Sequence, residues 1–333
     1  MTTTGYGDIT PVSFWGRIVG LITMALGVVF TALVAGNITS ALIGMQQRKG
    51  KGLLKLRKMN KHFIICGWKP DFERILDGVL EANVDLIKTD VVLINTAPGE
   101  VMEALMSNPK YKLLNYVYGD FIEEDVLLRA GIKTAAKVLI LADYSQPRTP
   151  LEVDSRTILA ILTIENMNRY LYTAAELLDE KFESHLKLAH CDEVILSQEY
   201  ERKLLINAST GIGVSHVIRD LMDFGNDTGL AIQEISPDHM GKTFDFLFHH
   251  YYEQKNSILI GLLENTGNLF TRKREALNEA QKTPNIIQIV ANMKKIKSMQ
   301  PNSSVLSPEK DYVIRANTKA ITVTRSKVGL YGR

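Results

Sequence analysis

No charged residue occurs between Ile18 and Gln47, a stretch dominated by Ile, Val, Leu, Ala, Met and Gly. At about 1.5 Å per residue, a helix of this length spans about 45 Å, more than the hydrocarbon core of a bilayer requires. Its frequent glycines are ordinary for a membrane helix, where small residues permit close packing. The pattern predicts one membrane-spanning helix within residues 11–47. A signal peptide would need a positively charged start, and the first ten residues carry only the negative Asp8.

Beyond this helix, short apolar runs alternate with longer helical ones. The runs that predict strands are His62–Cys66, Val91–Asn95, Leu113–Tyr118, Ala136–Ala142, Leu171–Ala175 and Glu193–Leu196. Helices are expected between them, including residues 71–82 and 151–169. Such alternation predicts a parallel sheet covered on both faces, which is a Rossmann-like lobe over residues 62–197.

The last third of the chain has a different pattern. Residues 198–225 form an amphipathic segment broken near Gly211 and Gly213, whose apolar stripe must be covered by its own domain or by another copy. Residues 226–333 predict a small α+β lobe, with strands at 230–235, 258–263, 312–315 and 320–324 and a helix at 244–253.

An insertion at residues 265–307, rich in Lys, Asn, Gln and Ser, interrupts this lobe and contains a helix-capable run at Asn285–Lys297. We interpret it as a solvated excursion with a short docked helix; a ligand or partner element is the alternative. His239, His249 and His250 show no metal-ligand spacing and are interpreted as structural or surface residues.

Charge supports this order of segments. Residues 48–61 form a linker with seven basic residues and no acidic one, so the positive-inside rule places this end in the cytoplasm, near anionic headgroups. The formal net charge is only +2, and the lysines do not gather on an aromatic-studded face, so nucleic-acid binding is not expected. Two cysteines, Cys66 and Cys191, suit a reducing cytosol and provide no zinc set.

The first residues carry a candidate ion site. Thr3, Thr4, Gly5, Tyr6 and Gly7, followed by Asp8, resemble the selectivity filter of potassium channels. In such a filter, backbone carbonyls replace the hydration shell of K⁺, and glycines permit the unusual dihedral angles that this requires. The alternative is a chance polar turn.

Filter, inner helix, basic linker and Rossmann-like lobe follow the order of ligand-gated potassium channels that carry RCK (regulator of K⁺ conductance) domains. The chain resembles this family, of the prokaryotic calcium-gated type, over residues 1 to about 225. Short sequence motifs support the resemblance: His62–Trp68, Gly119–Asp120, Ala130–Gly131 and Ala189–Ile195.

The resemblance implies a tetrameric pore for K⁺ in the cell (inner) membrane and a cytoplasmic gating ring of four or eight RCK domains. It also implies that residues 198–225 form a helical crossover that pairs neighbouring domains. Gly27 falls at the gating hinge of the inner helix, with Gly20 and Gly36 as alternatives. Because a pore helix and an outer helix precede the filter in the family, we expect this chain to be truncated, or internally started, at the filter.

A ligand cleft is implied at the carboxyl ends of the strands. The residues expected there are Gly67, Trp68, Asn95, Asp120 and Asp143. A dinucleotide needs further glycines after Gly67 and an acid after the second strand, but Lys69, Glu73 and Asn95 stand there instead, which argues against one. Asp120 and Asp143 either face a ligand or cap the turns that they follow.

Asp143 and Glu176 match approximately the positions of calcium ligands in relatives and would supply part of an oxygen shell. A second family glutamate is absent, so the regulator, Ca²⁺ or a nucleotide, is not identified by the sequence. No nucleophile elbow, Walker loop or other enzyme motif is present, and we predict that the protein is not an enzyme. Two other functions stay open: a pore-less regulatory ring subunit of a potassium transport system, and an NAD-dependent oxidoreductase, which the altered glycine turn disfavours.

Overall fold

The computed structural model describes residues 10–50, 52, 59–83, 90–111, 113–223, 228–281, 286–297, 299 and 301–324. The chain divides into two compact units, Met1–Leu54 and Lys55–Arg333, and the division falls within the predicted basic linker. The predicted selectivity filter, from Thr3 to Asp8, lies outside the described residues.

The first unit is dominated by one long helix, α1, at Phe14–Gly50. Within its segment Phe14–Ser40, the most apolar window of 18 residues has a mean hydropathy of 2.5, and 6% of that window is buried within the chain. Thr23 and Thr39 donate their hydroxyl hydrogens to the carbonyl oxygens four residues earlier, so these polar groups are satisfied inside the helix. By length and composition, α1 is able to cross a bilayer.

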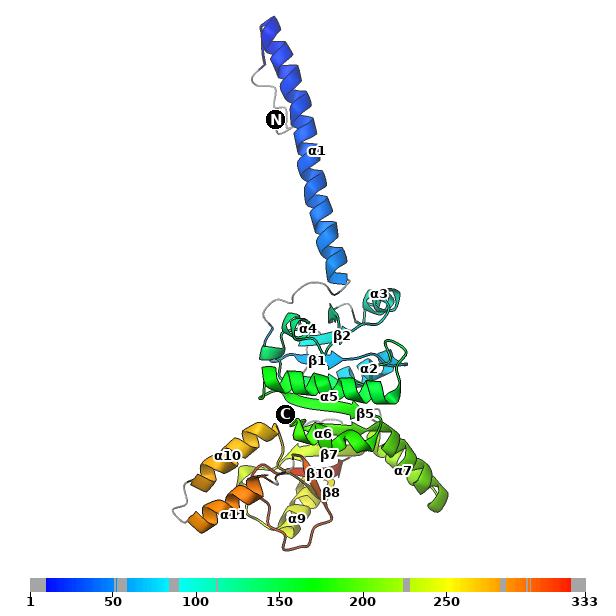
Figure 1. The fold of residues 1–333 in the computed structure, drawn as a ribbon, viewed down its shortest axis with the longest axis vertical. Helices are drawn as coiled ribbons and strands as arrows, with labels where there is room; N and C mark the ends of the chain where they lie inside the picture. The colour runs from blue at the N-terminus through cyan, green and yellow to red at the C-terminus, as the bar shows by residue number, and fades with distance from the viewer. Residues whose placement is uncertain are drawn as a thin grey trace. The chain divides into compact units, whose positions relative to one another are not determined.

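The second unit begins with a sheet of six strands in the order β3-β2-β1-β4-β5-β6, all parallel (Figure 1). The strands are β1 Phe63–Cys66, β2 Val91–Asn95, β3 Asn115–Tyr118, β4 Lys137–Ile140, β5 Tyr172–Leu177 and β6 Glu193–Leu196. The helices between them are α2 Phe72–Ala82, α3 Gly99–Ser107, α4 Glu124–Arg129, α5 Pro150–Met167 and α6 Glu183–Leu188, with the 3₁₀ turns η2 Ile132–Thr134 and η3 Glu180–Phe182. The predicted Rossmann-like sheet is confirmed, with strand ends that differ by a few residues.

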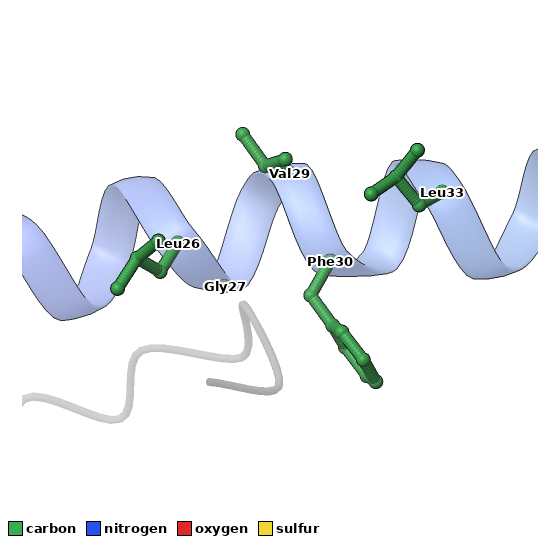
Figure 2. A pocket seen from close by; sticks show the side chains of 5 residues that line it. All are labelled: Leu26, Gly27, Val29, Phe30 and Leu33. Atoms are coloured by element: carbon green, nitrogen blue, oxygen red, sulfur yellow. The ribbon is translucent and has the colours of Figure 1, made fainter.

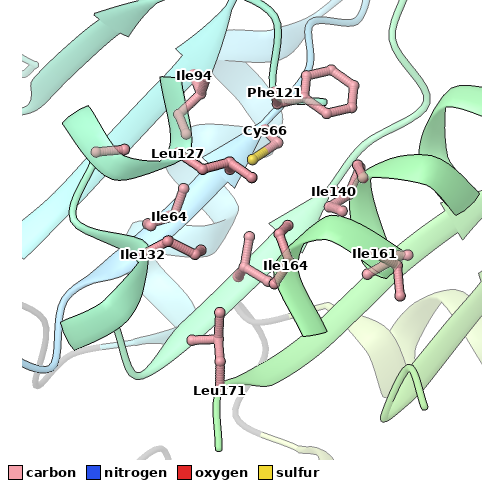
Figure 3. Close-up of a cluster of buried hydrophobic side chains, with 14 of the residues drawn as sticks. Ile64, Cys66, Ile94, Phe121, Leu127, Ile132, Ile140, Ile161, Ile164 and Leu171 are labelled. Carbon is pink, nitrogen blue, oxygen red and sulfur yellow. The ribbon is translucent and has the colours of Figure 1, made fainter. Parts of the chain in front are cut away.

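Two apolar layers hold the sheet. On one face, side chains of α4, α5 and α6 pack over the strands around Ile64, Cys66 and Ile164 (Figure 3). On the other face, α2 and α3 cover β1, β2 and β3 through residues such as Leu76 and Met102. The strands β1 and β2 are buried throughout because both of their faces are covered in this way.

The C-terminal lobe is an antiparallel sheet in the order β7-β10-β8-β9. Its strands are β7 Gly229–Glu234, β8 Ser257–Glu264, β9 Ser303–Leu306 and β10 Lys319–Thr324, and α9 Phe244–Lys255 packs against it, after the 3₁₀ turn η4 Pro237–His239. The helices α7 Ser197–Thr210 and α8 Val214–Met222 join the two lobes and break at Gly211–Gly213, as predicted.

One predicted strand is wrong and one was missed. Residues 312–315 form only a single bridge, between Val313 and Thr243, because their backbone pairs with the irregular turn at residues 241–244. The fourth strand of the sheet is instead β9, which pairs with β8 and lies inside the predicted insertion. Its Ser-Ser-Val-Leu sequence is short and polar, so it gave no strand signal.

The insertion contains two helices that pack together, α10 Leu269–Gln281 and α11 Ile286–Lys297. The helix predicted at Asn285–Lys297 is confirmed as α11, but the solvated excursion is wrong, because the start of α10 is buried against the Rossmann-like lobe. Asp192 Oδ1 accepts a hydrogen bond from the Leu269 backbone N–H at 2.7 Å. The Nδ2 of Asn268 donates to the Leu171 carbonyl at 3.1 Å.

We call this contact the Asp192 junction: Asp192, Asn268 and Leu269, with Thr173 and Glu165 behind them. Asp192 Oδ2 also accepts from the Thr173 N–H at 2.9 Å, so one carboxylate caps α10 and holds β5. The Thr173 hydroxyl donates to Glu165 Oε1 at 3.2 Å. Burial raises the pKa of Glu165 to about 8, with a further contribution from the charge of Asp192.

The stability of the protein should therefore fall as the pH rises. Glu165 titrates in the folded chain at a pKa of about 8 and normally at 4.5, so between these values the folded state holds a proton that the unfolded state has released. We expect the melting temperature to fall by roughly 5–10 °C between about pH 6 and 9, since one pKa unit corresponds to about 1.4 kcal/mol. Glu165→Gln should flatten this slope in a thermal melt.

The control is Glu103→Gln, which removes an exposed carboxyl on α3. It should keep the pH slope of the unchanged protein. Equal slopes in Glu165→Gln and the unchanged protein would contradict the assignment of the buried proton to Glu165.

Candidate functional site

The candidate site lies at the carboxyl ends of β1, β4 and β5. The strand order reverses between β1 and β4, and folds of this kind bind ligands outside the carboxyl ends of the strands at such a reversal. We call this position the crevice. Of the predicted residues, Gly67 and Trp68 follow β1, Asp143 follows β4, and Glu176 lies in β5.

Gly67 allows the two loops to meet. Its φ is +95°, and its N–H donates to the Ile94 carbonyl oxygen at 2.8 Å. A Cβ at this position would lie 2.8 Å from the Leu141 carbonyl oxygen, so a larger residue would force the loops apart. The glycine of the first turn thus serves the contact between the loops that follow β1 and β4.

Trp68 joins these two loops. Its backbone N–H donates to Asp143 Oδ1 at 3.1 Å, and its backbone carbonyl accepts from the Tyr144 backbone N–H at 2.7 Å. Its ring stacks on Phe72, with 4.7 Å between centroids. The indole therefore covers the start of α2.

Asp143 is buried and fully engaged. Besides Trp68, its Oδ1 accepts from the Ser145 N–H at 3.1 Å, while Oδ2 accepts from the Ser145 hydroxyl at 2.9 Å and from Arg148 Nη1 at 2.8 Å. The carboxylate both forms a turn and pairs with a guanidinium. Two functions were predicted for Asp143, ligand binding and capping of its own turn. The contacts with Ser145 correspond to the second.

Glu176 is also buried, and it is paired with the side chain of Lys69. Its Oε1 accepts from Lys69 Nζ at 2.6 Å, and its Oε2 accepts from the Ala142 N–H at 3.0 Å. Lys69 and Arg148 were not predicted as partners of these carboxylates. They could have been, because both follow closely after a strand, β1 or β4, and the ends of parallel strands meet at one edge of the sheet.

Asn95 and Asp120 lie at the ends of the neighbouring strands β2 and β3. Asn95 Oδ1 accepts from the Ala97 N–H at 3.2 Å and from the Tyr116 hydroxyl at 3.3 Å, so the side chain serves its own turn. Asp120 Oδ1 accepts from Arg156 Nη2 at 2.7 Å and from the Ile122 N–H at 3.1 Å.

These contacts do not fit the phosphates of a dinucleotide. The backbone N–H groups of Gly67 and Trp68, which would bind a phosphate, donate to Ile94 and Asp143. Glu73 adds a negative charge in the first turn of α2, which a phosphate would meet.

Nor do the contacts, as arranged, fit a divalent cation between Asp143 and Glu176. Each carboxylate already has a basic partner, and a hard cation needs 6–8 oxygen ligands. Among the described residues, no group of three or more His, Cys, Asp and Glu side chains is placed to hold a metal ion. A calcium function for Asp143 and Glu176 therefore stays a prediction.

The predicted hinge glycine, Gly27, lies in the middle of α1. Figure 2 shows the side chains of Leu26, Val29, Phe30 and Leu33 on the turns of α1 next to Gly27. These five residues line an apolar pocket of about 460 Å³. The hinge itself stays a prediction.

The fold and the site define a class: a Rossmann-like lobe whose loops after β1 and β4 meet, preceded in the chain by an apolar helix. Residues 58–202 match the model of the calcium-activated potassium channel slowpoke-like RCK domain, and residues 1–44 match the ion channel model. The chain therefore carries a segment similar to ion channels followed by one similar to an RCK domain, in the order that its sequence predicts.

Individual relatives agree. The chain is 30% identical to the calcium-gated potassium channel TvoK of Thermoplasma volcanium, over 66% of this chain and 59% of TvoK. It is 26% identical to the putative potassium channel protein YugO of Bacillus subtilis, over 62% of this chain and 59% of YugO. The chain thus spans less than two thirds of the length of these relatives. The human SLO3 gating ring shares the fold, with a TM-score of 0.52 and 13% identity over 80% of this chain and 44% of that one.

Gly67→Ala should destabilise the protein by at least about 2 kcal/mol, because the new Cβ meets the Leu141 carbonyl and the positive φ disfavours any side chain. Chemical denaturation followed by tryptophan fluorescence would measure this, since Trp68 is the next residue. Gly78→Ala is the matched control. Gly78 lies within α2 with open space around its Cβ position, so alanine should stabilise by about 0.5–1 kcal/mol. A Gly67→Ala variant as stable as the unchanged protein would contradict the close contact.

Proposed function

We propose that this chain is a subunit of a potassium channel whose RCK domains form a cytoplasmic, ligand-sensing gating ring. The observation that carries the proposal is the order of two matches in one chain, an ion-channel segment at residues 1–44 followed by a Slo-like RCK domain at residues 58–202. The basic residues of the intervening linker favour a cytoplasmic position for the RCK domain.

In this proposal, Thr3–Gly7 and Asp8 form one quarter of a filter that binds K⁺ through backbone carbonyls, so four copies line one pore. A ligand would shift the ring between two states by its differential affinity for them. The linker at residues 48–61 would transmit the shift to α1, which would bend near Gly27 because a glycine weakens a helix there.

Potassium flux into liposomes tests the proposal, with the protein expressed from its full reading frame. We expect flux that is selective for K⁺ over Na⁺ and is lost in Gly5→Ala, because the added methyl group disturbs the carbonyl geometry of the filter. Gly99→Ala is the control: the structure has open space at this exposed position at the start of α3, so flux should persist. Absence of any K⁺-selective flux from the complete protein would refute the channel function.

We also propose that a second copy of the chain covers α7 and α8. Neither helix has a buried residue within the chain, and the apolar side chains of Leu205, Val217 and Met222 are exposed. The sheet offers a second surface, because a groove of about 370 Å³ lies between α2 and the strands β4, β5 and β6. Apolar side chains that include Leu139, Ala174 and Ile195 line it, together with the charged side chains of Arg74, Lys137 and Glu193. Burial of both surfaces would pair the domains, as the resemblance implies.

Val217→Asp should weaken this pairing at least about tenfold in Kd, because it places a charge in an apolar contact. Mass photometry over a dilution series would measure the change. Val101→Asp on α3 is the matched control, since both valines are exposed, at 59% for Val217 and 42% for Val101. Equal association of the two variants would show that α8 is not part of the contact between copies.

A further inference from the structure

Two basic side chains hold the carboxyl end of the sheet from within. Lys69 Nζ lies 2.6 Å from Glu176 Oε1, and Arg148 Nη1 lies 2.8 Å from Asp143 Oδ2. The two carboxylate side chains are only 5% and 3% exposed. A carboxylate buried to this extent needs a positive partner, because burial removes its hydration.

The two basic partners differ in their distance along the sequence. Arg148 lies only five positions after Asp143, whereas Lys69 belongs to the loop after β1 and reaches Glu176 in β5, 107 positions away. Glu176 Oε2 in turn accepts from the Ala142 N–H in the loop after β4. One ion pair and one hydrogen bond of Glu176 therefore tie the ends of β1, β4 and β5 together.

Further acidic groups lie close to Glu176. Asp154 is buried and accepts from the backbone N–H groups of Leu178 and Asp179, both at 2.9 Å. Burial raises the pKa of Asp154; these two bonds oppose the shift, and the charges of Asp179 and Glu176 add to it. The Lys69 ammonium thus counters negative charge that would otherwise attract a hard cation.

We propose that Lys69 is a tethered cation, whose ammonium group occupies the position at Glu176 that a divalent cation would otherwise take. While Lys69 is present, this crevice is closed to Ca²⁺. The inference rests on the proposed function, in which a gating ring senses a ligand. It adds that the ring does not sense Ca²⁺ at this crevice. Its test reads stability and cation binding, so its outcome is independent of whether the protein conducts K⁺.

Lys69→Met in the full chain, purified in detergent, tests this. Methionine keeps most of the length of the lysine side chain and removes the charge. In EGTA, we expect the melting temperature to fall by roughly 5–10 °C, because Glu176 is left buried without a cation. Ca²⁺ at about 1 mM, the weak end of calcium affinities in proteins, should restore most of this loss and leave the unchanged protein unaffected.

Two variants serve as controls. Lys69→Met combined with Glu176→Gln removes both charges, so it should regain stability in EGTA and lose the response to Ca²⁺. Lys110→Met removes a lysine that lies 2.6 Å from Asp77, but the two side chains are 42% and 32% exposed. That variant should lose little stability and gain no response to Ca²⁺, because water solvates the remaining carboxylate.

Two results would overturn the inference. The first is stabilisation of the unchanged protein by Ca²⁺ that Glu176→Gln abolishes, since the crevice would then accept the ion beside Lys69. The second is a Lys69→Met variant that does not respond to Ca²⁺. If this variant folds only in the presence of Ca²⁺, its unfolding on addition of EGTA gives the expected result, with the double variant as the reference that stays folded.

Discussion

The close approach of Gly67 to the Leu141 carbonyl oxygen is the contact on which the arrangement of the crevice depends. It brings the loop after β1 against the loop after β4, so the Trp68 N–H reaches Asp143. From the same loop, Lys69 reaches Glu176. The crevice at the switch point of the sheet is therefore closed by the chain itself. Backbone N–H groups that bind phosphates in related folds donate to protein oxygens here.

The Asp192 junction connects the Rossmann-like lobe to the C-terminal lobe. One buried carboxylate accepts the first N–H of α10 and the N–H of Thr173 in β5. A helix N-terminus is the end that favours a negative charge, so the contact is both a hydrogen bond and a favourable dipole interaction. The Asp192 junction thus joins the C-terminal lobe to the amino end of the sheet, opposite the crevice.

In the described part of the second unit, apolar side chains are exposed on α7–α8 and line a groove over β4–β6. A single chain leaves them in water, at a cost that the proposed pairing of copies would remove. The proposed gating ring would pair domains in this way. Because Lys69 and Arg148 pair with the carboxylates of the crevice, the proposal places a ligand of the ring at interfaces between copies.

The apolar helix, the parallel sheet and the break between α7 and α8 could be predicted from the sequence, because they follow from local periodicity and from where glycines lie. Gly67, Asp143 and Glu176 could likewise be assigned to strand ends. Three contacts became visible only in the folded chain: Lys69 pairs with Glu176, Asp192 caps α10, and β9 completes the second sheet. Each of these contacts joins residues far apart in the chain, and short polar segments carry no periodic signal of the partner that they meet.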